Sequence, residues 1–435
     1  MIPIRATRTQ RTQTDPTIVP LSRNRNYRLL WVSQALTAFG GSAAGIAFPL
    51  LVLTITDSPA IVGLVLGSTA AASLLVGLPA GALVDRWNRK MVMLGSEAVG
   101  VVASLSLVLA LWWDVASVAH MVAVAAVFGI CGAMFVPAEE ACLPNLVPNE
   151  QLPTAVAMNA ARGSLGGLSG TAAGGFLYAV GRSVPFSVDV LTRIIGFLVL
   201  LFLRIPPRDV RPEPFSRLRH EIATGLRWMW GHRPVRVIGL FAVGLNMFFT
   251  AYFIIIIVLA RDRGVSSGEI GIMAAMMGVG GILGALVAPY LYRRLSTYIS
   301  IIGVFWAVTL LTPLAVFISS GYLMGVLFAA ISFLAPTANT TIATYQLMLT
   351  PDELRGRMSS VMGLLIGSSA VMGPALGGFL MEGVSGNQAV LLCAAGIGVV
   401  TVLGTISPTL RRFPRHVVAE EPAATTQEYE SQAEQ

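Results

Sequence analysis

The stretch Ile238–Ala260, IGLFAVGLNMFFTAYFIIIIVLA, runs for 23 residues without a charged side chain. A helix needs about 20 apolar residues to cross the hydrocarbon core of a bilayer. It also satisfies its own backbone N–H and C=O groups there, where water cannot reach them. The stretch therefore predicts a transmembrane helix. Uncharged runs at Trp31–Thr56 and Ile61–Val84 predict that the chain crosses the membrane several times.

Composition extends this inference to the whole chain. Of its 435 residues, 55% are hydrophobic and only 12% are charged, and the mean hydropathy is +0.73. A soluble domain carries about 25% charged residues, so we expect an all-α polytopic membrane protein. Three cysteines without a pairing pattern and four scattered histidines indicate neither disulfides nor a metal site.

The motifs of an ATP-driven pump and of a His-Glu-x-x-His metal enzyme are absent from the sequence. Its one lysine, Lys90, does not belong to the GxxxxGK[ST] pattern of a phosphate-binding loop, which excludes an ATP-driven pump within the chain. There is no His-Glu-x-x-His. We therefore expect a protein that is not an enzyme and that needs no cofactor.

Charge-free runs between Gly, Pro and charged residues predict twelve spans in two sets of six. The spans lie near residues 28–53, 60–84, 91–113, 117–138, 154–180, 185–203, 234–260, 268–291, 298–318, 321–346, 357–381 and 387–409. The expected parts are a cytoplasmic polar tail (1–26), a six-helix bundle (27–203), a cytoplasmic linker (204–233), a second six-helix bundle (234–409) and a cytoplasmic tail (410–435). In the linker, an amphipathic helix is predicted from the helical spacing of Phe215, Leu218, Ile222, Leu226 and Met229.

The distribution of cations predicts the orientation of these spans. If the amino terminus is cytoplasmic, 25 of the 29 Lys and Arg residues fall on cytoplasmic segments, and the others are Arg182, Arg193, Arg261 and Arg263. Cationic loops resist translocation, so we expect both termini in the cytoplasm. The net charge of +7 then serves topology rather than nucleic-acid binding.

Short repeats relate the two predicted bundles. Pro148-Asn-Glu150 and Pro351-Asp-Glu353 are 203 residues apart, as are two copies of Gly-Gly-Phe-Leu that begin at Gly174 and Gly377. Two pseudo-symmetric six-helix halves are typical of transporters that move one half against the other around a central site.

The segment GALVDRWNRK, Gly81–Lys90, resembles the signature between the second and third spans of the major facilitator superfamily. The matching residues are Gly81, Leu83, Asp85, Arg86, Arg89 and Lys90. The resemblance implies a gating motif made of these residues, with Gly81, Asp85, Arg86, Arg89 and Lys90 as its central members. Asn88 stands where glycine is usual, which is tolerable because Asn accepts left-handed backbone geometry.

Four further stretches are similar to the subgroup that contains macrolide-efflux proteins and the enterobactin exporter. They are NYRLLWVSQALTAFG (26–40), PAEEACLPNLVPNEQL (137–152), GLRWMWGHRPVRVIG (225–239) and TPDELRGRMSSV (350–361). The resemblance covers residues 26–410. It implies a monomeric secondary transporter of the plasma (inner) membrane that exports amphipathic or hydrophobic small molecules, such as a drug, an antibiotic or a siderophore-like metabolite, by proton antiport with alternating access. An importer on the same fold and a non-transporting receptor or scaffold are the alternatives.

Small residues spaced four apart predict close helix packing in lipid. In the resembled fold, span 2 packs on span 11 and span 5 on span 8, across the seam between the halves. The residues expected at this seam are Gly170, Gly174, Gly175, Gly373, Pro374, Gly377 and Gly378. Thr171 departs from the Gly-Pro-x-x-Gly-Gly motif of drug antiporters, which is complete only at 373–378.

Charged side chains within a span are costly and need a partner or a function. Asp189 and Arg193, four apart on span 6, predict an ion pair. We expect a latch near the cytoplasmic face, with its acids as candidates for proton coupling. The residues considered for latch or coupling are Glu97, Glu139, Glu140, Arg162, Asp189, Arg193, Arg355 and Arg357.

Amide and aromatic side chains on the spans are the candidates for a substrate cavity. They are Gln34, Asn159, Asn246, Phe248, Tyr252, Asn339, Tyr345 and Gln346. A mostly apolar cavity with a few amides suits amphipathic organic compounds better than sugars or inorganic ions.

Overall fold

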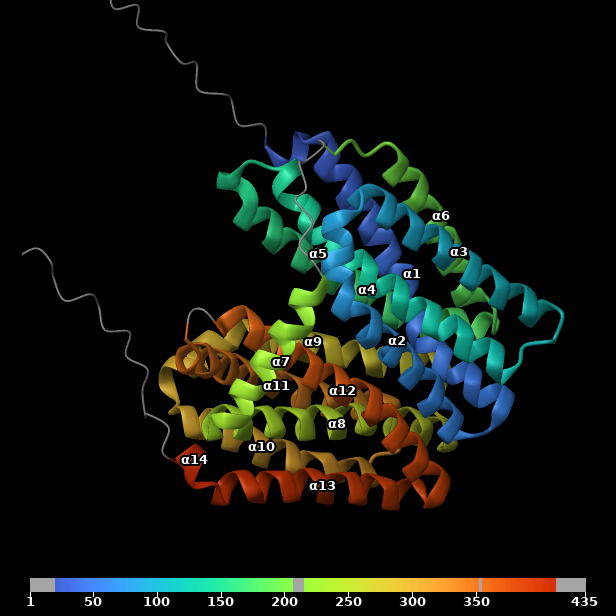
Figure 1. Ribbon diagram of the computed structural model, residues 1–435. Coiled ribbons are helices and arrows are strands. Elements are labelled where there is room, and N and C mark those ends of the chain that lie inside the picture. The colour runs from blue at the N-terminus through green and yellow to red at the C-terminus, as the bar shows by residue number, and fades with distance from the viewer. Residues whose placement is uncertain (1–19, 206–214, 352–353, 412–435) are drawn as a thin grey trace, which may run out of the picture.

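The computed structural model describes residues 20–205, 215–351 and 354–411. Some side chains inside these ranges lie outside the described part, including those of Asp85, Arg355 and Arg357 of the expected gate and latch. Over the described ranges the chain is helical and contains no strand, which confirms the predicted all-α class (Figure 1).

Helices of the first half form one bundle and those of the second half form another (Figure 1). The first contains α1 (Arg25–Thr56), α2 (Pro59–Arg86), α3 (Arg89–Trp112), α4 (Val118–Leu146), α5 (Leu152–Val180) and α6 (Val184–Leu201). The second contains α8 (Arg233–Asp262), α9 (Ser267–Arg294), α10 (Thr297–Leu311), α11 (Gly321–Leu349), α12 (Arg355–Gly383) and α13 (Gly386–Ile406). Between them lies α7 (Phe215–Gly231), and the described chain ends in α14 (Pro408–Arg411). The short 3-10 helices are η1 (Leu21–Arg23), η2 (Asn149–Gln151) and η3 (Thr312–Phe317).

Eleven of these helical segments in the described ranges are long and apolar enough to cross a membrane. They come from every helix of the two bundles except α5. That helix is 29 residues long and lies among the others, but it is rich in Gly, Ala, Ser and Thr. Small residues lower its hydropathy, and they also let neighbouring backbones approach. We therefore treat α5 as the twelfth span.

The packing pattern of the first bundle is repeated in the second. In the first, α1 packs on α5 and α6, α2 on α4, and α3 on α4 and α6. The corresponding pairs six spans later make the same contacts: α8 with α12 and α13, α9 with α11, and α10 with α11 and α13. The short sequence repeats therefore reflect a duplicated three-dimensional unit.

Two helix pairs join the bundles, α2 with α12 and α5 with α9. Gly63 of α2 lies against the backbone of Pro374, and Gly175 of α5 lies against the backbone of Gly271. A methyl group at either glycine would overlap main-chain atoms of the other bundle. Backbone approach of this kind is how helices pack without a hydrophobic driving force between them.

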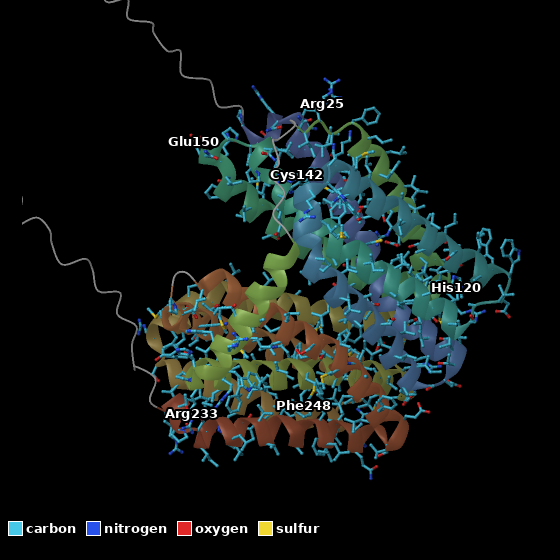
Figure 2. The ribbon with its side chains drawn as sticks, viewed as in Figure 1. Arg25, His120, Cys142, Glu150, Arg233 and Phe248 are labelled. Atoms are coloured by element: carbon cyan, nitrogen blue, oxygen red, sulfur yellow. The ribbon has the colours of Figure 1, made fainter. Side chains whose placement is uncertain are left out.

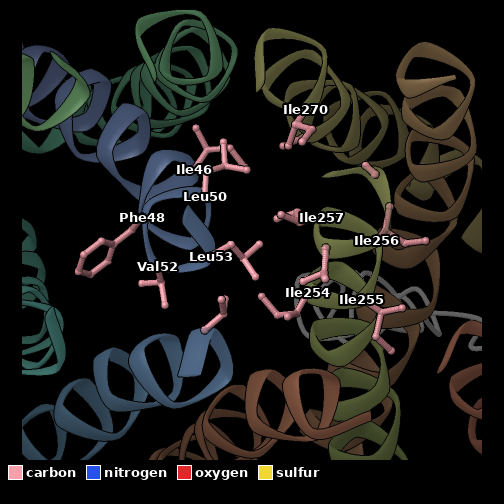
Figure 3. Packing of buried hydrophobic residues seen from close by; sticks show 14 of the residues in the cluster. Ile46, Phe48, Leu50, Val52, Leu53, Ile254, Ile255, Ile256, Ile257 and Ile270 are labelled. Carbon is pink, nitrogen blue, oxygen red and sulfur yellow. The ribbon is translucent and has the colours of Figure 1, made fainter. Parts of the chain in front are cut away.

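The seam is closed at the end of the molecule formed by the α1–α2 turn and the end of α8, here called the far end. Apolar side chains from the two bundles form one buried cluster there, with Leu53 of α1 facing Ile254 and Ile257 of α8 (Figure 3). Asp57 forms an ion pair with Arg261 at 3.1 Å. The Glu382 carboxylate of α12 accepts from the Ser58 hydroxyl at 2.8 Å and from the Ala60 N–H at 3.3 Å.

The bundles diverge toward the other end, where α6 ends and α8 begins, here called the linker end (Figure 1). Glycines near this end of the seam helices, Gly77 and Gly81 of α2 and Gly281 of α9, have no non-local atom within 4 Å of an added methyl group. Figure 2 shows Glu150 of the first bundle well separated from Arg233 of the second. The structure therefore opens at the linker end.

The segment around Asn88 differs from the sequence-based expectation in its backbone. Asn88 has φ −66° and ψ 111°, which is extended rather than left-handed. Its side chain accepts hydrogen bonds from the N–H groups of Lys90 and Met91 at the start of α3. Asn88 therefore replaces glycine because it caps a helix, and the left-handed explanation is wrong.

We expect Gly63→Ala to destabilise the protein relative to Gly77→Ala. The two variants share the gain in helix propensity, about 1 kcal/mol, but only the first places a methyl group on the opposing backbone, which costs about 1–3 kcal/mol. Thermal unfolding of the purified proteins can be followed with a thiol-reactive dye, because Cys131, Cys142 and Cys393 are free and buried. Equal melting temperatures would contradict the seam contact.

Candidate functional site

A cavity of about 420 Å³ lies inside the second bundle, between α8, α10, α11, α12 and α13. Three of the amides expected at a substrate cavity, Asn246, Asn339 and Gln346, line it together. The other described lining side chains are apolar, among them Phe249 and Phe305, and no charged residue contributes among those that the structure describes. Asn339 is exposed, so the amide-bearing wall is accessible from outside the bundle.

The other expected cavity residues lie elsewhere. Tyr252 is buried and its hydroxyl donates to the Thr312 carbonyl at 3.2 Å, while Tyr345 belongs to a buried cluster with Ile238. The ring of Phe248 packs against Gly396 of α13. Each of these aromatic residues packs within the second bundle, because its ring fills space between helices. Sequence spacing places a residue on a helix but does not say which neighbour that face meets.

Two expected cavity amides belong to the first bundle. Gln34 is buried and donates to the Ser33 hydroxyl at 3.3 Å. Asn159 accepts from the Tyr27 hydroxyl at 3.4 Å. Neither lines a described cavity shared with the three amides of the second bundle.

A second cavity, about 390 Å³, lies between the bundles. The first bundle contributes Ser42, Gly45 and Ile46 from α1 and small residues of α5 that include Gly167 and Thr171. The second bundle contributes Phe253 from α8 and Met277 and Gly278 from α9. Thr171, which departs from the antiporter motif, is thus a wall residue of this cavity.

A cluster of charged residues is buried inside the first bundle. The Asp189 carboxylate accepts from Arg193 Nε at 2.8 Å and from the Ser104 hydroxyl at 2.5 Å. Arg193 Nη1 lies 3.5 Å from Glu97 Oε2, and Glu97 Oε1 accepts from the Thr37 hydroxyl at 3.0 Å. Asp189 and Glu97 are 0% and 1% exposed. The cluster therefore links α1, α3 and α6 in the interior of the bundle.

Glu97, which was considered for the latch or for proton coupling, lies inside the bundle rather than at the end of α3. It lies eight residues from the start of α3, which at 1.5 Å per residue is about 12 Å from that end. Arg193 lies eight residues before the end of α6, at a similar depth. The predicted Asp189–Arg193 ion pair forms, and Glu97 makes it a triad.

Glycines provide the space for this triad. A methyl group at Gly100 of α3 would lie 2.8 Å from Arg193 Nη1. One at Gly196 of α6 would lie 2.8 Å from the Thr37 hydroxyl, and one at Gly41 of α1 would lie 3.9 Å from Asp189 Oδ1. The Phe128 ring of α4 lies over the Arg193 guanidinium at 5.3 Å, in a cation–π arrangement.

Other residues of the expected latch pair within one bundle. Glu139 of α4 and Arg162 of α5 form a buried ion pair at 2.8 Å. Arg89 Nη1 donates to the Ala141 carbonyl at 2.6 Å, and Lys90 Nζ donates to the Leu201 carbonyl at 2.7 Å. These contacts tie α3 to the ends of α4 and α6. In this open arrangement none of these contacts crosses to the second bundle.

The expected seam glycines divide between two kinds of contact. Gly175 and Gly378 face the opposite bundle, as does the backbone of Pro374. The structure corrects the others, which face helices of their own bundle: Gly170 and Gly174 pack on α1, and Gly373 and Gly377 pack on α8. Adjacent residues on a helix point about 100° apart, so Gly174 and Gly175 cannot face the same neighbour.

Sequence analysis missed the polar contacts that close the far end. Asp57, Arg261 and Glu382 lie at helix ends, where charged residues are common, so their sequence positions alone did not indicate a contact. Their opposite signs at the ends of facing spans were the available signal.

The family of the chain follows from comparison with known proteins. The model of the transmembrane secretion effector family matches residues 16–429. The chain belongs to this family of the major facilitator superfamily, which confirms the resemblance drawn from GALVDRWNRK. It is a multi-pass membrane transporter of the efflux type.

Curated relatives span nearly the whole chain. The multidrug efflux pump Tap of Mycolicibacterium fortuitum is 29% identical over 414 residues, covering 88% of this chain and 96% of Tap. The enterobactin exporter EntS of Salmonella typhimurium is 25% identical over 396 residues, covering 89% of this chain and 93% of EntS.

Solved structures share the fold. The nucleoside transporter NupG superposes with a TM-score of 0.71 at 14% identity, covering 89% of this chain and 99% of NupG. A bacterial homologue of the iron transporter ferroportin in an inward-facing state gives 0.68 at 15% identity, covering 88% and 98% of the two chains.

We expect Arg193→Leu to lower the melting temperature strongly. Removing the guanidinium leaves two buried carboxylates without a counter-ion, which costs about 3–5 kcal/mol. The control is Arg182→Leu, because Arg182 pairs with Asp114 at 3.9 Å in an exposed position and exposed pairs contribute about 0–1 kcal/mol.

The triple variant Arg193→Leu, Asp189→Asn, Glu97→Gln should recover a large part of the stability lost in Arg193→Leu, because it removes the uncompensated charge. If both arginine variants melt alike, the cluster does not stabilise the bundle.

Proposed function

We propose that this chain exports amphipathic or hydrophobic small molecules of a drug, antibiotic or siderophore-like kind by proton antiport. The observation that carries the substrate class is the cavity of the second bundle, in which three amides face an otherwise apolar wall. Amides orient a ligand through hydrogen bonds, while the apolar wall supplies most of the contact area. Because the described residues of its lining include no charged side chain, the cavity suits neutral compounds.

The names of the relatives support export and do not identify the cargo. Tap is a multidrug efflux pump and EntS an enterobactin exporter. Both match nearly the full length of this chain, so the comparison concerns the whole transporter rather than one bundle.

We further propose that the linker end is cytoplasmic, that both termini lie on that side of the plasma (inner) membrane, and that the protein acts as a monomer. Cations concentrate on the segments at the linker end, as the positive-inside rule requires. On this orientation, the arrangement that opens at the linker end is inward-facing. Substrate then enters from the cytoplasm while the far end is shut.

In the alternating-access cycle, the far-end contacts separate and the linker end closes. We propose that the GALVDRWNRK segment and the start of α12, which carries Arg355 and Arg357, meet in that second state. The seam helices α2 and α12 touch from Gly378, against Ala60, to Gly367, against Leu74, so a rocking motion about the middle of this seam separates the far end and brings the other ends together.

Nile red, a neutral amphipathic dye, provides the test of export. Cells preloaded with the dye and depleted of energy should lose it faster on re-energisation when they express the chain. Nigericin, which collapses the pH gradient, should remove this difference. Greater dye accumulation in expressing cells would indicate an importer, and no difference for any dye of a broad panel would indicate a receptor or scaffold.

Binding of Nile red to the purified protein tests the cavity. We expect Asn339→Leu to raise the Kd by about tenfold, because it removes one hydrogen bond worth about 1–1.5 kcal/mol while keeping the branched shape of the side chain. The matched control is Asn159→Leu, an amide of the first bundle that lies outside this cavity. An effect confined to the control would place the dye elsewhere.

A further inference from the structure

We propose that Glu97, held between Thr37 and Arg193, is the proton-binding residue of this transporter, and that protons reach it past Gly41 from the cavity between the bundles. The inference rests on the proton antiport proposed above and gives it a site. It draws on the charge balance, the hydrogen bonds and the surroundings of the triad.

The charge balance of the triad favours one bound proton. Two carboxylates, Glu97 and Asp189, share one guanidinium in a space closed to solvent. With both acids ionised the cluster carries one net negative charge, which is costly inside a membrane. A single proton makes it neutral. Among the described residues, the other titratable group facing it is the Cys131 thiol of α4, and those of α1 that face it carry no titratable side chain.

The hydrogen bonds select Glu97 as the carrier. Asp189 receives the close Arg193 Nε contact at 2.8 Å and the Ser104 hydroxyl at 2.5 Å, which together stabilise its ionised form. Glu97 lies 3.5 Å from Arg193 and holds one hydroxyl at 3.0 Å. Protonation of Glu97 therefore weakens fewer and longer polar contacts than protonation of Asp189 would.

The proposed proton route to the triad passes Gly41, which has no side chain. Gly45, one turn further along α1, is exposed and lines the cavity between the bundles. At Gly41, a methyl group would lie 3.8 Å from Arg193 Nη2 and 3.9 Å from Asp189 Oδ1. Asp189 Oδ1 is itself buried without a hydrogen-bond partner. Gly41 thus faces an unsatisfied acceptor of the triad and lies one helical turn from a residue of the cavity wall.

The helix α1 connects the proton with the transport cycle. It carries Thr37, which bonds Glu97, then Ser42 and Gly45 of the cavity wall, and then Leu53 of the far-end closure. A proton on Glu97 removes its charge attraction to Arg193. The polar contacts of the triad that join α1, α3 and α6 therefore change together. Proton and substrate act on the same helix, as exchange requires.

Infrared spectroscopy of the full chain in liposomes tests the site without a substrate. Lowering the pH should produce the C=O stretching band of a buried protonated carboxyl group. Glu97→Gln should lack the band, Glu97→Asp should keep it at a shifted frequency, and the control Glu139→Gln should keep it unchanged. A band that survives in Glu97→Gln, or disappears in Glu139→Gln, overturns the assignment.

The route past Gly41 is tested by comparing two substitutions of that residue. After a pH jump, the band should develop more slowly in Gly41→Leu than in Gly41→Ala, because the alanine methyl group fits at 3.8 Å and the leucine side chain fills the route. Equal rates in Gly41→Leu and the unmodified chain overturn the route past Gly41.

Transport separates this inference from the proposed function. The Kd of Nile red should rise by up to about tenfold per unit fall in pH over the range where the triad takes up its proton, and Glu97→Gln should abolish this dependence along with gradient-driven efflux. If efflux by the Glu97→Gln variant still depends on the pH gradient, Glu97 is not the proton-binding residue, and the proposed antiport is retained. If efflux by the unmodified chain does not depend on the pH gradient although its Glu97 band titrates, the proposed antiport is wrong and Glu97 is retained as a proton-binding residue.

Discussion

Close approach of helix backbones is the constraint on which this structure depends. Lipid is as apolar as the helix surfaces, so association relies on packing and on interhelical hydrogen bonds. In α5, Gly174 joins the helix to α1 and Gly175 joins it to the other bundle. In α12, Gly377 and Gly378 do the same toward α8 and α2. Both of these seam helices therefore carry two glycine faces, one for their own bundle and one for the other.

Each of the four cations outside the linker-end segments has a polar partner in the structure. Arg182 pairs with Asp114, Arg261 with Asp57, and Arg193 with two carboxylates. Arg263 donates to the carbonyls of Ala315 and Val316 at 2.9 and 3.0 Å. These four cations thus differ from the others in their position along the spans, and each has a local partner.

The two bundles share one arrangement of helices but differ in the polar residues they contain. Their helix contacts correspond pair by pair, whereas the charged triad belongs to the first and the amide-lined cavity to the second. We propose that this asymmetry divides proton binding from substrate binding. The cavity between the bundles, lined by α1 and α5 on one side and α8 and α9 on the other, is where the two halves communicate.

The sequence by itself determined the membrane class, the twelve spans in two sets of six and the family, because apolar run length, cation placement and the GALVDRWNRK motif are local properties of the chain. It also predicted the Asp189–Arg193 pair, since residues four apart share a helix face. Only the tertiary structure brought Glu97 to that pair, gathered three of eight candidate cavity residues and sorted the glycines into two kinds of contact. Those outcomes depend on which neighbour each helix face meets, and helical spacing alone does not specify the neighbour.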